Sequence, residues 1–142
     1  MSENWTRISA SWTGGLTFLG ENDKEGKVQM GSSENTETIT PMQMLLVGLA
    51  GCTGMDIVSI LHKKRIELEK FQIKVEAKKA DSFPKIWTDI HVRYLLWGNG
   101  IKNSDVEQAI KLSEEKYCSV SIMLGKSAEI SSTYQINLPE KQ

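Results

Sequence analysis

The longest apolar stretch of the chain follows Pro41 and ends before the cationic residues 62–65. Thr40, Pro41 and Gln43 form a helix-start signal, because threonine can accept a backbone N–H, proline suits the first helical position and glutamine can complete a capping box. Cations at the far end suit the last helical turn. The pattern predicts one long helix over residues 40–65. Since it is apolar on every side, we expect it to be buried on every side.

This predicted helix is also long enough to cross a membrane, for which about 18 or more apolar residues are the usual criterion. Asp56 lies well inside it, and a carboxylate in lipid is costly, so we favour a core helix over a membrane span. Gly48, Gly51 and Gly54 recur every three residues, and each weakens the helix by about 1 kcal/mol relative to alanine. We expect close approach of another backbone to compensate, at the centre of a domain or at a subunit contact.

Alternation of apolar and polar residues predicts β-strands on both sides of the helix. Before it, three short strands are expected to form an antiparallel meander: Trp5 to Trp12, Leu16 to Leu19 and Lys27 to Met30. After it, two strands are expected to form a β-hairpin: the alternating segment Phe71 to Lys78, and Trp87 to Trp97, which has apolar residues on both sides. We interpret the four tryptophans as anchors of the core and the hairpin rather than as a cofactor stack.

A second helix is predicted from Ser104, which has Glu107 three residues later in a capping-box pattern, to about Tyr117. A short apolar run at residues 119–124 suits one or two further helical turns, and residues 128–136 alternate as a last strand. The order βββ-α-ββ-α-β predicts an α+β fold with mostly antiparallel pairing.

The totals place this pattern in a single soluble domain. A chain of 142 residues suits one domain over residues 1–142, and a net charge of -1 gives no electrostatic reason to expect a nucleic-acid or anionic-membrane partner. The first residues lack a basic segment followed by an apolar one, so we expect no signal peptide. Two cysteines without such a signal favour a reducing cytoplasm as the location.

The chemistry of the chain depends on its two cysteines, Cys52 in the long helix and Cys118 after the second helix. They form no CxxC motif, and with His62 and His91 at unrelated spacing they do not predict a metal site. Composition alone favours inert core thiols over a reactive pair, which needs a thiolate and access to it. Asp56, one turn after Cys52, could orient an interior group, but we expect it to pair with a basic residue.

The contexts of both cysteines, TPMQMLLVGLAGC at residues 40–52 and EKYCSVSIML at residues 115–124, resemble the OsmC/Ohr family of thiol-dependent peroxidases, in its OsmC-like branch. The segment IWTDIHVRYLLWGNGIKNSDVEQAI is similar to the hairpin and second helix of that family. The resemblance implies a curved, mostly antiparallel sheet around a long central buried helix, in an intertwined homodimer. It implies that Cys52 is the peroxidatic cysteine, that Cys118 resolves it to a disulfide, and that an external dithiol reduces the pair. No metal, haem, flavin or other cofactor is implied.

Two departures from the family pattern change this expectation. Ohr-type members carry an arginine near the N-terminal strands, held by a glutamate in the helix opening, and that arginine supports the peroxidatic thiolate. Here no arginine lies between Ile8 and Lys64, and Met42 stands at the glutamate position. We therefore expect slow reduction of organic hydroperoxides at neutral pH, rising toward about pH 9. The alternatives are a non-catalytic dimer that binds an apolar small molecule, and a redox sensor.

Overall fold

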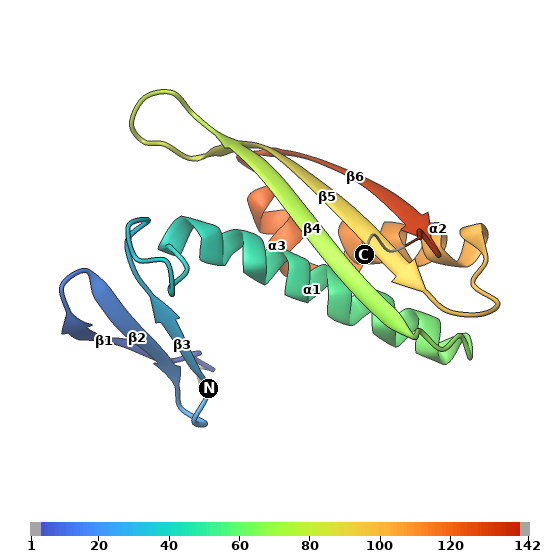
Figure 1. Ribbon diagram of the computed structural model, residues 1–142, viewed down its shortest axis with the longest axis horizontal. Helices are drawn as coiled ribbons and strands as arrows, with labels where there is room; N and C mark the ends of the chain where they lie inside the picture. The colour runs from blue at the N-terminus through green and yellow to red at the C-terminus, as the bar shows by residue number, and fades with distance from the viewer. Residues whose placement is uncertain (1–3, 140–142) are drawn as a thin grey trace. The chain divides into compact units, whose positions relative to one another are not determined.

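The computed structural model describes residues 4–139. The predictions of one domain over residues 1–142 and of no signal peptide at the first residues extend beyond this range. Residues 4–139 divide into two compact units at the junction of residues 45 and 46 (Figure 1). The organisation of residues 1–142 as one domain stays a prediction. The order of elements follows the predicted βββ-α-ββ-α-β pattern, with the second helical region divided into shorter pieces.

The first unit contains the predicted antiparallel meander. Its strands are β1 (Ile8–Gly14), β2 (Thr17–Asn22) and β3 (Lys27–Met30), in the order β1-β2-β3. The first strand begins later than expected and the second extends further. Trp5 and Trp12 are each 67% exposed, so their interpretation as core anchors is wrong within this chain. The reason is that the meander is a single layer, so these side chains have no second layer within their own unit to pack against.

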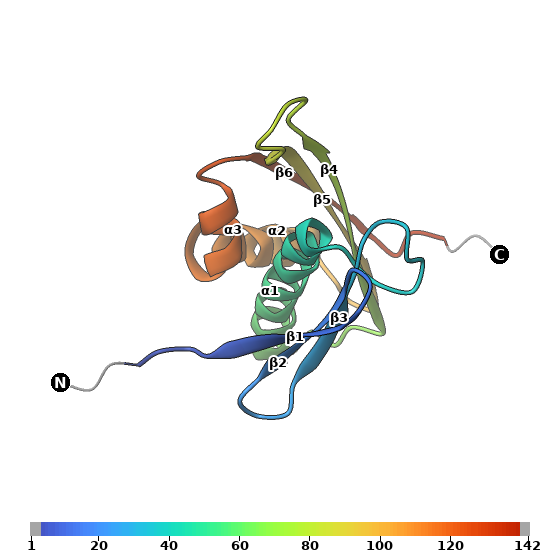
Figure 2. The ribbon, with the colours of Figure 1, turned by 90° about the vertical axis from the view of Figure 1, so that its left-hand side faces the viewer.

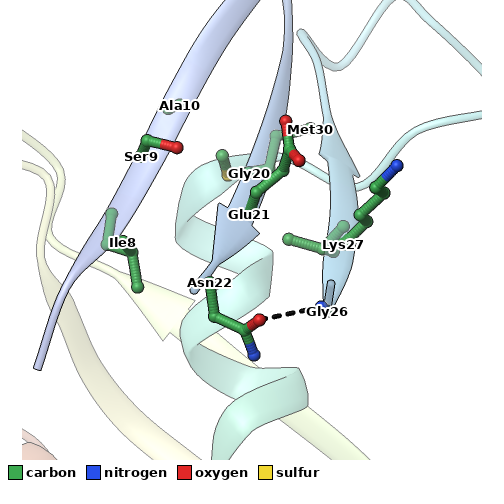
Figure 3. A pocket seen from close by; sticks show the side chains of 10 residues that line it. Ile8, Ser9, Ala10, Gly20, Glu21, Asn22, Gly26, Lys27 and Met30 are labelled. Carbon is green, nitrogen blue, oxygen red and sulfur yellow. Dashed lines mark hydrogen bonds between the residues drawn. The ribbon is translucent and has the colours of Figure 1, made fainter. Parts of the chain in front are cut away.

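A recess of about 390 Å³ lies on the meander (Figure 3). Its floor is open because Gly20 has no side chain, and a Cβ there would lie 3.2 Å from Val28 Cγ1. At one end, Asn22 Oδ1 accepts hydrogen bonds from the backbone N–H groups of Lys24 and Gly26, both at 2.8 Å, which fixes the turn between β2 and β3. The recess is therefore a by-product of a glycine and a tight turn.

Helix α1 (Pro41–Lys63) begins as predicted. Thr40 N–H donates to Gln43 Oε1 at 3.0 Å and Gln43 N–H donates to Thr40 Oγ1 at 3.1 Å, so the capping box is confirmed. The helix ends at Lys63. Just beyond it, Arg65 has a left-handed φ of 62°, and Ile66 N–H donates back to Leu61 O at 2.9 Å.

Burial of α1 on every side, however, is wrong for the single chain. One face is buried, through Leu49, Thr53, Ile57 and Leu61. Large apolar residues are exposed elsewhere on the helix, namely Val47, Met55 and Val58 on another face and Leu45 near the first turn. By length and composition alone this helix could cross a membrane, but its buried face packs as a core helix does. One three-stranded sheet and two short helices cannot surround it.

The second unit is built on a three-stranded sheet with the order β4-β5-β6. The predicted hairpin is confirmed by antiparallel pairing of β4 (Lys70–Lys79) with β5 (Trp87–Trp97). Strand β6 (Glu129–Ile136) pairs with β5 in parallel, so the sheet is mixed. Figure 2 shows the helices on one face of this sheet. That face carries the buried side chains of β5, among them Ile90, Val92, Tyr94 and Leu96.

The second helical region has three parts. Helix α2 (Asn103–Leu112) continues into a wider π-helical segment (Ser113–Tyr117), and α3 (Ser119–Leu124) follows after Cys118. The predicted capping box is wrong, because α2 begins one residue before Ser104 and has no side-chain cap. Glu107 instead accepts a hydrogen bond from Tyr134 Oη at 2.6 Å, since it faces the sheet.

Candidate active site

The structure brings the two cysteines of the chain together, with one carboxylate beside them. Cys52 and Asp56 lie one turn apart on α1, both half-buried, and the buried Cys118 stands between the π-helical segment and α3. The two Sγ atoms and one carboxylate oxygen of Asp56 all lie within 4.8 Å of one another. Spacing of four residues puts the first two side chains on one helical face, as the sequence predicts.

The π-helical segment holds Cys118 in place. Cys118 N–H donates to Ser113 O at 2.7 Å, which closes the wide turn, and the backbone then becomes extended at Cys118. Its Sγ caps α3 by accepting the N–H of Ser121 at 3.3 Å. π-turns of this kind are frequent at functional sites, because the extra residue redirects a side chain. Here the turn directs a fully buried thiol toward α1.

Asp56 has a hydroxyl partner instead of the expected basic one. Ser113 Oγ donates to Asp56 Oδ2 at 2.9 Å. Among residues 4–139, no lysine, arginine or histidine forms an ion pair with the Asp56 carboxylate. The ion pair in this part of the chain joins Lys64 to Asp105, at 3.2 Å. Ser113 therefore links both parts of the site, through its side chain to Asp56 and through its carbonyl to Cys118.

Burial raises the pKa of the Cys118 thiol to about 12, and hydrogen bonding to Cys52 acts in the same direction. The N–H of Ser121 opposes this but does not outweigh burial. Cys118 therefore holds its proton at neutral pH. Any reaction at this sulfur must remove that proton as the new bond forms.

A second polar group lies under the same helices. Tyr94, fully buried on β5, donates from Oη to Glu114 Oε2 at 2.7 Å, and Ser132 Oγ donates to Glu114 Oε1 at 3.2 Å. Burial raises the pKa of Tyr94 well above its usual range, and the bond to Glu114 adds to the shift. Thr53, also buried, donates to Leu49 O at 3.1 Å. This network supports the fold around Cys118.

Other charged and polar candidates lie elsewhere. His62 is exposed, and His91 is half-buried on the sheet with Nδ1 2.7 Å from Ser131 Oγ, as expected of residues outside the site. Arg93 alternates with the inward Tyr94 and lines an open recess with Lys70 and Lys74. Arg93 thus faces away from the thiols and does not replace the arginine of Ohr-type proteins.

The sequence did not identify Ser113 or Glu114 as parts of this region. A signal was present, because the helical spacing of Val106, Ala109 and Ile110 continues to a serine at a core position. A buried hydroxyl needs a partner, which Asp56 provides. The π-turn itself has no such signal, since a regular helix satisfies the same apolar pattern.

Comparison with known proteins identifies the family. The model for "OsmC-like protein" matches residues 33–133, which include both cysteines and Asp56. The chain belongs to the OsmC-like family. Protein YhfA of Escherichia coli (strain K12) is 34% identical over 125 residues, covering 88% of this chain and 93% of YhfA.

Solved structures of other proteins have the same fold. A hypothetical protein from Aquifex aeolicus VF5 superimposes with a TM-score of 0.81 at 31% identity, covering 96% of this chain and 100% of that one. An organic hydroperoxide resistance protein OsmC from Legionella pneumophila superimposes with a TM-score of 0.69 at 16% identity, covering 95% and 99%. The α+β, OsmC-like fold predicted from the two cysteine contexts is therefore confirmed.

Proposed function

We propose that this OsmC-like protein reduces organic hydroperoxides with Cys52 and Cys118, as part of defence against oxidative stress. The observation that carries the proposal is the proximity of the two sulfurs, within 4.8 Å, although they come from segments far apart in the chain. A structural relative described as an organic hydroperoxide resistance protein supports the substrate class. Membership of the family supports the general role in peroxide defence.

The proposed reaction has three balanced steps. The Cys52 thiolate attacks the O–O bond of ROOH, which gives a Cys52 sulfenic acid and, after protonation, ROH. The Cys118 thiol then attacks this sulfur, releasing water and forming the Cys52–Cys118 disulfide, while its proton goes to the departing oxygen. An external dithiol reduces the disulfide and is itself oxidised. Closing two sulfurs from 4.8 Å or less to the disulfide length of about 2.05 Å requires side-chain rotation and small backbone adjustment.

Electrostatics argue for slow turnover. Asp56 is the charged group beside the thiols, and a carboxylate opposes ionisation of its neighbours. Arg93 lies on the other face of the sheet. Arg93 is therefore not placed to activate the thiols, and we expect slow turnover at neutral pH.

We further propose that the protein is a cytoplasmic, obligate homodimer. Val47, Gly51, Met55 and Val58 follow one another at helical spacing along the exposed face of α1. With Phe71 and Ile73 of β4, this face lines an open groove of about 730 Å³. Exposed apolar surface of this extent marks an interaction site, and a second copy of α1 would cover it. Sedimentation showing a stable, folded monomer at micromolar concentration would exclude the dimer.

The second candidate function is binding of an apolar small molecule, and the same groove favours it. A fluorescent apolar probe distinguishes the two. If the groove binds ligands, the probe binds the dimer with saturation and Met55→Lys abolishes binding. If the groove is covered by the second copy, the dimer takes up no probe.

The test of the peroxidase is consumption of a panel of hydroperoxides in the presence of dithiols. We expect consumption of alkyl hydroperoxides by the wild type and none by Cys52→Ser. Met55→Leu, which leaves the thiols unchanged, serves as the control. Equal consumption by the wild type and Cys52→Ser would exclude the proposed function.

A further inference from the structure

Three metal-binding side chains converge at the thiol site. Cys52 and Asp56 stand at positions i and i+4 of α1, the same spacing that lets two side chains of one helix bind a single zinc ion. Cys118 approaches from the N-terminus of α3, and the three donor atoms lie within 4.8 Å of one another. The sequence did not predict this set, because it combines neighbouring helical residues with a distant one and uses no histidine.

We propose that Cys52, Asp56 and Cys118 form a binding site for a thiophilic divalent cation, with Zn²⁺ as the ion of best fit. Zinc prefers four ligands in a tetrahedron, with Zn–S near 2.3 Å and Zn–O near 2.1 Å, which separates neighbouring donors by about 3.6–3.8 Å. Donors within 4.8 Å reach this spacing by side-chain rotation. Two sulfurs and one oxygen leave the fourth position for water or another small ligand.

The charge of the site favours a cation. Asp56 pairs with no lysine, arginine or histidine among residues 4–139, and each thiol that ionises adds a further negative charge. A divalent ion compensates these charges directly. Binding is written as two thiols plus Zn²⁺ giving two Zn–S bonds and two released protons, with the carboxylate as third ligand. No electron transfer is needed.

The surroundings orient the ligands as in known metal sites. The oxygen Asp56 Oδ2 accepts the hydrogen bond from Ser113 Oγ, and this leaves lone pairs on the carboxylate for a metal. Such outer hydrogen bonds fix ligand orientation, and their loss lowers metal affinity by about 10- to 100-fold. Because the carbonyl of the same serine holds Cys118 N–H, the π-turn fixes two of the three ligands together. Asp56 is thus a ligand of the proposed metal site, although it takes no part in the proposed peroxide chemistry.

The site and the peroxidase use the same sulfurs in different states. A zinc-bound pair has no free thiol to attack ROOH, and the disulfide has no thiolate to bind zinc. The inference does not rest on the proposed function, because the dithiol pair can bind zinc whether or not it reacts with peroxide.

The experiment titrates reduced protein with Zn²⁺ against a chromophoric chelator, in a buffer without thiols or peroxide, with proton release followed by pH indicator. We expect one zinc per chain, up to two protons released per zinc, and at least tenfold weaker binding in Asp56→Asn. Cys52→Ser and Cys118→Ser each lose more. The matched control is Glu115→Gln, an exposed carboxylate of the π-helical segment, which binds like the wild type.

Wild-type affinity no greater than that of Cys52→Ser overturns the site, and so does an Asp56→Asn variant that binds as tightly as the wild type. Should a variant misfold by circular dichroism, Co²⁺ bound to wild-type protein decides. Strong visible bands with sulfur-to-cobalt charge transfer show a four-coordinate thiolate site, and weak bands without charge transfer overturn it. Failure of hydroperoxide consumption with intact zinc binding would contradict the peroxidase alone.

Discussion

Two tyrosine–glutamate hydrogen bonds of nearly equal length differ in burial and so allow a controlled test of the packing under the site. Tyr94 donates to Glu114 at 2.7 Å from a fully buried position, whereas Tyr134 donates to Glu107 at 2.6 Å near the surface. A hydrogen bond to a charged group contributes about 1.5–3 kcal/mol. We expect Tyr94→Phe to lower the free energy of unfolding by an amount near the lower end of this range, because Ser132 still donates to Glu114 after the substitution.

Tyr134→Phe removes the same hydroxyl where water can replace it, so we expect a change below about 0.5 kcal/mol. Urea unfolding at pH 7, followed by circular dichroism at one fixed protein concentration, measures both variants. Neither substitution removes much apolar volume, so the comparison isolates the hydrogen bond. Equal effects of the two variants would refute the claim that the Tyr94–Glu114 bond is a buried, structural contact.

Three further predictions concern the thiols and α1. Cys118→Ser should react once with hydroperoxide and then accumulate over-oxidised Cys52 instead of a disulfide, as mass spectrometry of the intact chain would reveal; lasting turnover with dithiol would contradict this. The raised pKa of Cys118 means that the folded state binds the thiol proton more tightly than the unfolded state does. The free energy of unfolding should therefore fall as pH rises from about 9 toward about 12, by at most about 1.4 kcal/mol per pH unit. Urea unfolding at each pH should show a less steep fall in Cys118→Ser. A Cβ at Gly51 meets nothing within 4 Å in the single chain, so Gly51→Ala should stabilise a monomer by about 1 kcal/mol. The same substitution should weaken a dimer in which two α1 helices pack closely. Sedimentation equilibrium distinguishes these outcomes.

Local signals in the sequence were enough for most elements. The capping box at Thr40 predicted the start of α1, and a run with apolar residues on both sides predicted β5 from Trp87 to Trp97 with both ends correct. Each signal involves residues close in the chain, where hydrogen bonding and side-chain period act directly. The equivalent signal at Ser104 gave a wrong prediction, because the Glu107 carboxylate accepts a hydrogen bond from Tyr134 of the sheet instead of capping the helix.

Long-range features were beyond such signals. Parallel pairing of β6 with β5 depends on how the chain returns across the helices, which the apolar pattern does not specify. The placing of Cys118 beside Cys52 depends on the π-turn from Ser113, and the sequence pattern suggested the pairing through family resemblance alone. The exposed face of α1 could not be predicted from periodicity, because apolar residues on all sides of a helix do not indicate whether the same chain or another one covers each face.

If Cys52 and Cys118 act as one redox pair, peptide mapping of the reduced protein after one equivalent of an alkyl hydroperoxide detects their product directly. We expect an intramolecular Cys52–Cys118 disulfide, with the loss of two hydrogen masses per chain and one hydroperoxide consumed. Recovery of both cysteines as free thiols, or of Cys52 as sulfinic acid beside an unreacted Cys118, would contradict it.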